Sequence, residues 1–542
     1  MSRRQQKVAH CCEKFCNQTS LHGWQYLSTE PSLWQKLTWF LAILSVTALA
    51  IILNVNNVMD FLNMTPVTDI KNTNAPLKDL TFPMITINNF NQIPRSELKK
   101  FQMGIYTPKH LRAFMAEYLH GSNSPSKYLD KIQQEMKEAY PEMNEKTQLH
   151  ELMKQKCEDF IIFSEWKSTY IKVMEPVTVD ITDWGYSCSI IPYLDYEHQG
   201  EFTASDAIKI QKGGGRSGAS LGLRMLIDVE AYEYSDFNFG STGIKVGFGD
   251  ATEKPTFTRD GLYAQPGTES ILAMIPTQVH TTEAAIKRFT PTQRNCYTDE
   301  ELNLTHFTED LGFAYSLNNC IYEAALQATL EKCKCHPYYF YYGKTNLKAC
   351  RGSSLQCAKE VLRNNSKVIT TRENTEMECM DSCTRIEYES DYSSALYPNQ
   401  NTFFNRMDVC FVLRKVAKVC QTNSYAILQN MKEWAQVEIE CEEVLKAHVD
   451  EGICLNSTHV SKSQRDMHKD LFKGLFYYAR DNIIHLKVYF KDPYYTIITR
   501  DVGTTLISFI GNVGGLLGLC LGLSFLSVFE IIYHFVNACF IK

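Results

Sequence analysis

The stretch GNVGGLLGLCLGLSFLSVFE, residues 511–530, is apolar enough for a membrane helix, yet five of its twenty residues are glycine. It belongs to a longer segment, residues 504–529, that contains no charged side chain. A second uncharged segment, LTWFLAILSVTALAIIL, occupies residues 37–53. Because each segment is long enough to cross a bilayer, we predict two membrane spans.

The residues around the first segment predict its orientation. Arg3, Arg4 and Lys7 precede it, whereas Asp60 and Asp69 follow it, and a basic flank favours the cytoplasmic side. Many polar residues lie ahead of it and no small-residue cleavage pattern follows, so we interpret it as an uncleaved span rather than a signal peptide. Both termini are then cytoplasmic in a multi-pass protein of the plasma membrane. The expected parts are a cytoplasmic region 1–33, a span 34–55, an extracellular domain 56–501, a span 502–536 and a cytoplasmic tail 537–542.

Cysteine usage agrees with this topology. Fourteen of the nineteen cysteines fall in the predicted extracellular domain, an even number that suits seven disulfides in an oxidising compartment. The alternative for Cys333 and Cys335 is a zinc site. The disulfide candidates are Cys157, Cys188, Cys296, Cys320, Cys333, Cys335, Cys350, Cys357, Cys379, Cys383, Cys410, Cys420, Cys441 and Cys454. The same domain holds N-glycosylation sequons at Asn63, Asn303, Asn364 and Asn456.

The predicted extracellular domain mixes strands and helices. No internal repeat or low-complexity linker is evident, so we expect one compact, disulfide-rich α+β domain. Apolar runs and alternation predict strands at residues 82–90, 222–230 and 486–490. Helical periodicity appears within residues 110–161 and at 324–333 and 470–484.

The sequence gives little support to an enzyme or a nucleic-acid-binding protein. A net charge of −6 gives no reason to expect nucleic acid. GGGRSGAS, residues 213–220, has the glycine spacing of a phosphate-binding loop but lacks its lysine, so a turn is expected there. The histidines are scattered and no nucleophile, base and orienting group come together, so we expect neither catalysis nor a cofactor nor a metal.

The glycines of the second segment follow a helical period. Gly511, Gly515, Gly518 and Gly522 recur at steps of four, three and four, which places them on one helical face. Such a face lets helix backbones approach closely, so simple helix packing is one interpretation. The other is an ion path, because hydroxyls follow at Ser524 and Ser527 and a carboxylate at Glu530, and an ionisable residue in a span faces protein or water.

At these residues the chain resembles the degenerin/epithelial sodium channel family, and the resemblance covers nearly its whole length. The pattern GG-x-x-GL-x-x-G-x-S-x-L-S-x-x-E runs from Gly514 to Glu530. His22-Gly23 is similar to the family's cytoplasmic His-Gly motif. Other matches are FPMITINN at residues 82–89, YSLNNC at 315–320, CKCHP at 333–337, C-x-x-x-C-x-x-x-x-Y at 379–388 and LKVYF at 486–490.

The resemblance implies a trimer, homomeric or with related subunits, around a sodium-conducting pore in the lipid bilayer that amiloride blocks. It implies finger, thumb, palm, knuckle and ball regions in each extracellular domain. Gly522, Leu523 and Ser524 would form the selectivity filter, and His22 and Gly23 a re-entrant segment below it. The other implied pore-lining or gating residues are Gly511, where a bulky side chain should hold the pore open, Asn512, Gly515, Gly518 and Glu530.

The chain also departs from the family pattern. Asn88 stands where many members have cysteine, and we therefore expect Cys157 to pair with Cys188. Asn512 occupies a position that is aspartate in acid-sensing members, and Ala324 one that is cysteine. Gln293 replaces the thumb-base tryptophan of those channels, which leaves the coupling between thumb and pore open.

The opening stimulus is the least determined property. Thr65-Pro66 stands where acid-sensing members carry a histidine pair, so proton gating loses its simplest sensor, although the acidic pair Glu309-Asp310 could still respond. The helical insertion at residues 107–161 resembles the finger of FMRFamide-gated channels, which favours opening by an extracellular neuropeptide. A cationic amidated peptide would suit an acidic, aromatic pocket. A proton-gated or constitutively open sodium channel, an ATP-gated trimeric channel and a non-conducting receptor remain alternatives.

Overall fold

The computed structural model describes two compact units. It describes residues 13–97, 155–166, 169–170, 177–191, 216–308, 312–337, 350, 354, 356–361 and 379–540, except for gaps at 183, 236–239, 258–260, 423, 435–438 and 456–458. The helical unit comprises Met1–Asp69, Thr281–Arg294 and Thr499–Lys542. The sheet unit comprises Ile70–His280 and Asn295–Ile498.

The sheets are mainly antiparallel and connect strands that are distant in the chain. One sheet has eight strands in the order β1-β15-β10-β14-β7-β3-β4, with β13 also pairing with β10. A second sheet has the order β5-β6-β2-β8-β9, and β11 pairs with β12. The strands are β1 (Pro66–Pro76), β2 (Met84–Asn89), β3 (Ile161–Trp166), β4 (Thr169–Tyr170), β5 (Val177–Thr182), β6 (Gly185–Ile190), β7 (Leu223–Asp228), β8 (Ile244–Gly249), β9 (Leu262–Ala264), β10 (Thr268–Thr281), β11 (Cys296–Tyr297), β12 (Asp381–Ser382), β13 (Thr384–Leu396), β14 (Ile483–Phe490) and β15 (Tyr494–Val502).

Apolar alternation explains the central strands, and the strands predicted from it, β2, β7 and β14, are confirmed. On β14, Leu486, Val488 and Phe490 are fully buried, whereas Lys487 and Tyr489 are only half-buried. These three residues share one core cluster with residues of β2 and β7, which joins the two larger sheets. Leu226 of β7 belongs instead to a second cluster that contains the helices, so β7 is covered on both faces.

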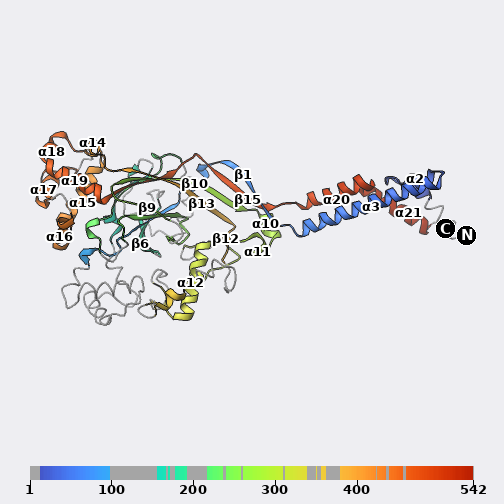
Figure 1. Ribbon diagram of the computed structural model, residues 1–542, viewed down its shortest axis with the longest axis horizontal. Coiled ribbons are helices and arrows are strands. Elements are labelled where there is room, and N and C mark those ends of the chain that lie inside the picture. The colour runs from blue at the N-terminus through green and yellow to red at the C-terminus, as the bar shows by residue number, and fades with distance from the viewer. Residues whose placement is uncertain are drawn as a thin grey trace. The chain divides into compact units, whose positions relative to one another are not determined.

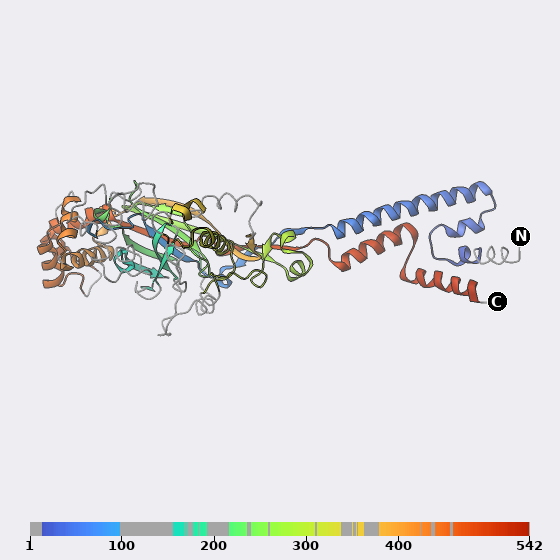
Figure 2. The same cartoon turned by 90° about the horizontal axis from the view of Figure 1, so that it is seen from below.

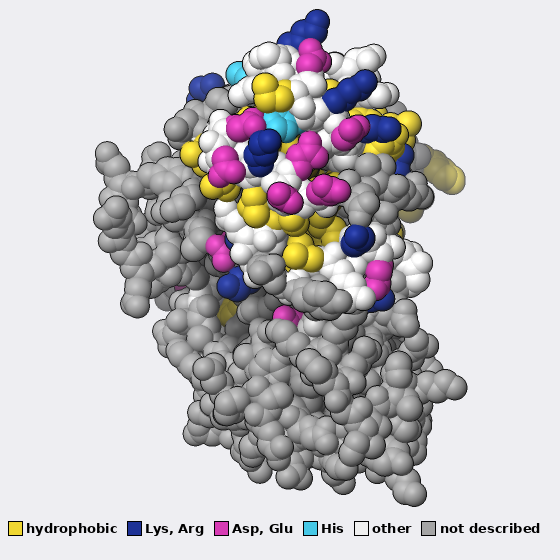
Figure 3. All heavy atoms as spheres, turned by 90° about the vertical axis from the view of Figure 1, so that its left-hand side faces the viewer, with side chains coloured by type: hydrophobic (Ala, Val, Ile, Leu, Met, Phe, Trp, Pro, Cys, Tyr) yellow, Lys and Arg dark blue, Asp and Glu magenta, His cyan; other side chains and the backbone are white. Residues whose placement is uncertain are grey.

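Helices of the sheet unit gather at one end of the strands (Figure 1). They include α14 (Gln400–Phe403), α15 (Asp408–Thr422), α16 (Tyr425–Trp434), α17 (Cys441–Leu445), α18 (Lys462–Met467) and α19 (Lys469–Asn482). η5 (Lys446–Asp450) continues α17 directly. The unit also contains α8 (Cys157–Phe160), α12 (Leu317–Cys333), η1 (Leu77–Asp79) and η2 (Ala231–Glu233). Acidic and basic side chains alternate over the face that α14–α18 present, so its described part carries no single-sign patch (Figure 3). The predicted helices at 324–333 and 470–484 are confirmed by α12 and α19.

All fourteen predicted cysteines form disulfides, and Cys157 pairs with Cys188 as expected. Cys333 and Cys335 bond to separate partners, so they do not form the alternative zinc site. The other bridges are Cys296–Cys383, Cys320–Cys379, Cys333–Cys357, Cys335–Cys350, Cys410–Cys454 and Cys420–Cys441. The predicted helices at 110–154 and the sequons at Asn364 and Asn456 lie outside the described residues.

The helical unit contains the helices that coincide with both predicted spans. It contains α2 (Trp24–Thr29), α3 (Leu33–Leu62), α10 (Glu283–Arg288), α11 (Pro291–Arg294), α20 (Leu506–Leu521) and α21 (Phe525–Phe540). α3 is long and apolar enough to cross a membrane, and it extends past the expected end at residue 55. The segment predicted as the second span, residues 502–536, contains two helices, α20 and α21, with a 58° bend between them (Figure 2).

A buried ionic cluster joins α15 to the end of β7. The Lys415 ammonium lies 2.7 Å from the Glu230 carboxylate and also donates to the Asp159 carbonyl. Asp228 accepts a hydrogen bond from the Tyr478 hydroxyl at 2.7 Å. Burial raises the pKa of Asp228 to about 7, and the nearby Lys415 opposes that rise. The Lys415 ammonium thus balances the negative charge of both carboxylates, Asp228 and Glu230. Without it, their charge would have no cation nearby to compensate it.

We predict that Lys415→Met lowers the free energy of unfolding by about 3 kcal/mol, because it leaves the buried Asp228 and the 14% exposed Glu230 without their cation. Lys418 on the same helix is the matched control, since its pair with Asp159 is 55% exposed on the lysine side. Lys418→Met should cost less than about 1 kcal/mol. Thermal unfolding of the purified full-length protein measures both. Equal losses for the two variants would contradict the assignment.

Candidate functional site

The break between α20 and α21 is built on a left-handed glycine. Gly522 follows the last residue of α20 and has φ +68°, a conformation that favours glycine because it has no Cβ. Its N–H donates to the Gly518 carbonyl at 2.9 Å, which closes the helix in the manner of an αL cap. Leu523 and Ser524 then have no regular secondary structure before α21 begins. The predicted filter residues therefore coincide with the break.

The amino-terminal segment docks on this break. The His22 N–H donates to the Leu521 carbonyl at 2.9 Å. A Cβ at Gly522 would lie 2.7 Å from the His22 ring, so the ring occupies the space that the missing side chain leaves. Gly23 is also left-handed, at φ +82°, and a Cβ there would lie 3.1 Å from Ile43 of α3. The predicted His-Gly motif thus fits between α3 and the break.

Hydroxyl and carboxylate oxygens cluster below the break. The Ser20 and Ser527 hydroxyls lie 2.9 Å apart, and Ser20 also donates to the Glu530 carboxylate at 2.9 Å. The Ser524 and Ser527 hydroxyls are 3.1 Å apart, and the side chain of Ser527 is buried. Sequence reasoning missed Ser20, and its position two residues before His22 was the only available signal.

The other predicted pore residues lie away from this cluster. A Cβ at Gly511, Gly514 or Gly515 would meet nothing within 4 Å, and one at Gly518 only the Leu523 carbonyl at 3.8 Å. Gly511 and Asn512 are exposed on α20. No described side chain of this chain fills the glycine face, so it can receive another helix or face a path between subunits.

A second feature of the helical unit links α10 to both α3 and α20. Arg288 donates to the Phe61 carbonyl at 2.8 Å, and its guanidinium lies 4.0 Å from the centre of the Phe61 ring. The Phe61 ring also stacks on Phe509 at 4.2 Å. One ring face accommodates one group at such distances, so Phe61 lies between Arg288 and Phe509. Gln293, expected at the thumb base, accepts a hydrogen bond from the Thr290 N–H instead.

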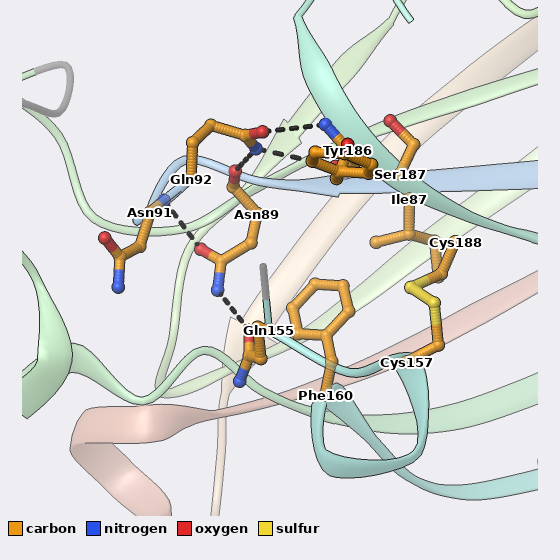
Figure 4. A pocket seen from close by; sticks show the side chains of 10 residues that line it. All are labelled: Ile87, Asn89, Asn91, Gln92, Gln155, Cys157, Phe160, Tyr186, Ser187 and Cys188. Atoms are coloured by element: carbon orange, nitrogen blue, oxygen red, sulfur yellow. Dashed lines mark hydrogen bonds between the residues drawn. A yellow bond between two sulfur atoms is a disulfide. The ribbon is translucent and has the colours of Figure 1, made fainter. Parts of the chain in front are cut away.

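Two pockets among the described residues of the sheet unit differ in their chemistry. The first, about 340 Å³, lies beside the Cys157–Cys188 disulfide and is lined by amides that bond to one another (Figure 4). Asn89 donates to Gln155 at 2.8 Å, and Gln92 accepts from the Tyr186 N–H at 2.8 Å. This pocket presents no carboxylate for a cationic peptide.

The second pocket, about 400 Å³, brings carboxylates and aromatic rings together. Asp250, Glu253, Phe248 and Phe257 all line it. Burial, aided by the charge of Asp250, raises the pKa of Glu253 to about 7.

Among the described sequons, Asn303 and Asn63 are exposed.

Comparison with known proteins agrees with these features. Residues 15–534 match the family described as amiloride-sensitive sodium channel. The sodium channel protein Nach of Drosophila melanogaster is 20% identical over 96% of this chain and 86% of its own length. Nach of Drosophila ananassae is 21% identical over 70% of this chain and 71% of its own. The epithelial sodium channel subunit beta of Aquarana catesbeiana is 21% identical over 58% of this chain and 92% of its own.

An apolar helix of membrane-spanning length and a disulfide-rich domain of strands and helices are what a membrane protein with an extracellular domain would show, and the family match assigns the chain to such a class. The chain belongs to the amiloride-sensitive sodium channel family, the degenerin/epithelial sodium channel family that its motifs predict. It is accordingly an ion channel protein and not an enzyme.

Replacing both Ser20 and Ser527 with cysteine should yield a disulfide, because their hydroxyl oxygens lie 2.9 Å apart. Mass spectrometry of the mildly oxidised full-length protein, with Cys11, Cys12, Cys16, Cys520 and Cys539 changed to serine, measures the yield.

Two glycine variants test what holds the segment in place. Gly522→Ala should reduce the crosslink, because the added Cβ would collide with the His22 ring. Gly518→Ala is the matched control and should leave the yield unchanged. A crosslink that survives Gly522→Ala undiminished would show that the glycine does not determine docking.

Proposed function

We propose that this chain is the subunit of a trimeric, amiloride-blocked, sodium-selective channel that an extracellular neuropeptide opens. The bent pair α20–α21 would form the second span, with residues 56–501 outside the cell and both termini inside. The single observation that carries the pore assignment is the helix break at Gly522, with His22, Ser20 and Glu530 gathered on it.

The chemistry of the break suits a sodium ion. The last carbonyls of α20 lie at the negative end of the helix dipole, which favours a cation. The Ser524 and Ser527 hydroxyls and the Glu530 carboxylate supply oxygen below it, and oxygen is the ligand that hard cations prefer. In a trimer, three copies of Gly522-Leu523-Ser524 would surround one path and act as the filter.

Neuropeptide opening rests on two observations. Thr65-Pro66 offers no titrating side chain at the place of the acid-sensing histidine pair. The second pocket offers the carboxylates of Asp250 and Glu253 and the rings of Phe248 and Phe257 to a cationic amidated peptide, beside one lysine, Lys254. Proton gating and constitutive opening remain the alternatives within the family.

Voltage-clamp recording from cells that express this chain alone tests the proposal. We expect amidated peptides such as FMRFamide to evoke a sodium current that amiloride blocks, while acid steps alone evoke none. Ser524→Ala should change ion selectivity, because it removes a hydroxyl at the break. An acid-evoked or standing current would overturn the neuropeptide as the opening stimulus. A Ser524 variant with unaltered selectivity would overturn the filter assignment.

A bulky side chain at Gly511 should hold the pore open, because it would prevent the glycine face of α20 from packing closely against a helix of a neighbouring subunit. Gly511→Cys, modified by a large thiol reagent during recording, should give a sustained amiloride-sensitive current. Leu506→Cys is the control, since Leu506 is 60% exposed and its position five residues before Gly511 places it away from the glycine face. An unchanged current after modification of Gly511→Cys would show that the proposed register is wrong.

A further inference from the structure

A histidine lies fully buried in the middle of the eight-stranded sheet. His485 of β14 pairs with Leu226 of β7 on one side and with Glu269 of β10 on the other. Its side chain has no exposed surface. Neither the family motifs nor the proposed pore involves this residue.

The hydrogen bond that His485 receives determines which of its nitrogens carries the proton. The Arg224 Nε–H donates to His485 Nε2 at 2.7 Å, so Nε2 is an acceptor and the proton of the neutral ring is on Nδ1. Nδ1 is buried and forms no hydrogen bond with any described residue. It lies 3.6 Å from a Glu269 carboxylate oxygen, which is too long for a hydrogen bond but close enough to become one after a small rotation.

The surrounding charges hold the two neighbours of His485 in fixed states. Arg224 stays protonated and is bound to Asp408 at 2.6 Å and to Glu165 at 3.3 Å. His485 and Lys487 hold the pKa of Glu269 at about 2, so Glu269 is a carboxylate at any physiological pH. The charged groups around the ring are Arg224 of β7, Glu165 of β3, Glu269 of β10, Lys487 of β14, and Asp408 with its partner Arg406; the Tyr397 ring lies 5.2 Å away.

A proton on Nε2 is incompatible with this arrangement. It would set an imidazolium donor against the arginine donor at 2.7 Å, and two like charges would meet in the interior. The protonated ring would therefore have to leave Arg224 and turn its Nδ1–H toward Glu269. Burial lowers the pKa of His485, and Arg224 lowers it further, whereas Glu269 raises it.

We propose that His485 is a buried proton-binding site, at which acid switches the sheet between an Arg224-bonded and a Glu269-bonded arrangement. In the second arrangement Arg224 loses one of its three partners, which weakens the link from β7 to α15. The switch is a means of modulation separate from the opening stimulus. That it senses extracellular acid rests on the proposed topology.

The sign of the pH effect follows from the lowered pKa. The unfolded chain takes up a proton near pH 6.5, whereas the folded chain does so only at lower pH, so stability falls as pH falls from 6.5. His485→Gln can still accept from Arg224 and donate to Glu269, but it does not titrate. His280→Gln is the matched control, because His280 lies exposed on β10.

The test is the thermal midpoint of the purified full-length protein at pH 7.5 and at pH 5.0. Between these values the wild type and His280→Gln should lose roughly 2 °C more than His485→Gln. Glu269→Gln should lose more than the wild type, because the protonated ring then has no charged acceptor. Equal losses in the wild type, His485→Gln and Glu269→Gln would overturn the proposal.

Recordings of the same variants separate this proposal from the channel proposal. An effect of acid on the current that His485→Gln abolishes, while His280→Gln retains it, would support the switch. Thermal unfolding does not depend on ion conduction. If the wild type and His485→Gln lose equal stability between the two pH values, only the proposal for His485 fails, and the channel proposal is unaffected. A silent channel with the predicted unfolding behaviour would speak only against the function.

Discussion

The arrangement of the helical unit depends on the left-handed conformation of Gly522. A side chain there would both strain the backbone and occupy the position of the His22 ring. The left-handed turn ends α20, and the Leu521 carbonyl then accepts its hydrogen bond from His22. That bond brings Ser20 within reach of Ser527 and Glu530, so one missing Cβ organises residues more than 500 positions apart.

The sheet unit is held by disulfides and by buried charges, and two of its buried titratable groups, Asp228 and His485, have opposite pH dependence. Disulfides close loops at and around α12 and α15, whereas buried charges join β7 to α15 through Arg224–Asp408 and through Lys415. Asp228 has a raised pKa, so its contribution is present below pH 3.8 and is lost as pH rises through about 7. His485 has a lowered pKa and acts in the other direction. The two groups therefore oppose each other near pH 6, and replacing either one exposes the other.

Local patterns predicted the elements whose residues alternate or repeat over one segment. β2, β7, β14, α12 and α19 follow from such patterns. The pairing of Cys157 with Cys188 came instead from the family resemblance, because Asn88 stands where many members have cysteine. The break at Gly522 did not follow, because an unbroken glycine period is what a continuous helix shows. The Ser20–Ser527 contact and the Arg224–His485 hydrogen bond were not predicted either. Each joins two segments that are distant in the sequence and share no local pattern.

The Arg288–Phe61–Phe509 stack explains how α10 can act on both α3 and α20 of the helical unit. Gln293 is engaged in its own turn, so the contact with α3 passes to Arg288 five residues earlier. A guanidinium over a ring is an attraction of about 1 kcal/mol at an exposed site, and the hydrogen bond to the Phe61 carbonyl fixes its direction. Phe509 completes the stack from α20 and stands two residues before Gly511. A displacement of α10 therefore reaches α20 through a single ring, at the end of the glycine face where helix separation would begin.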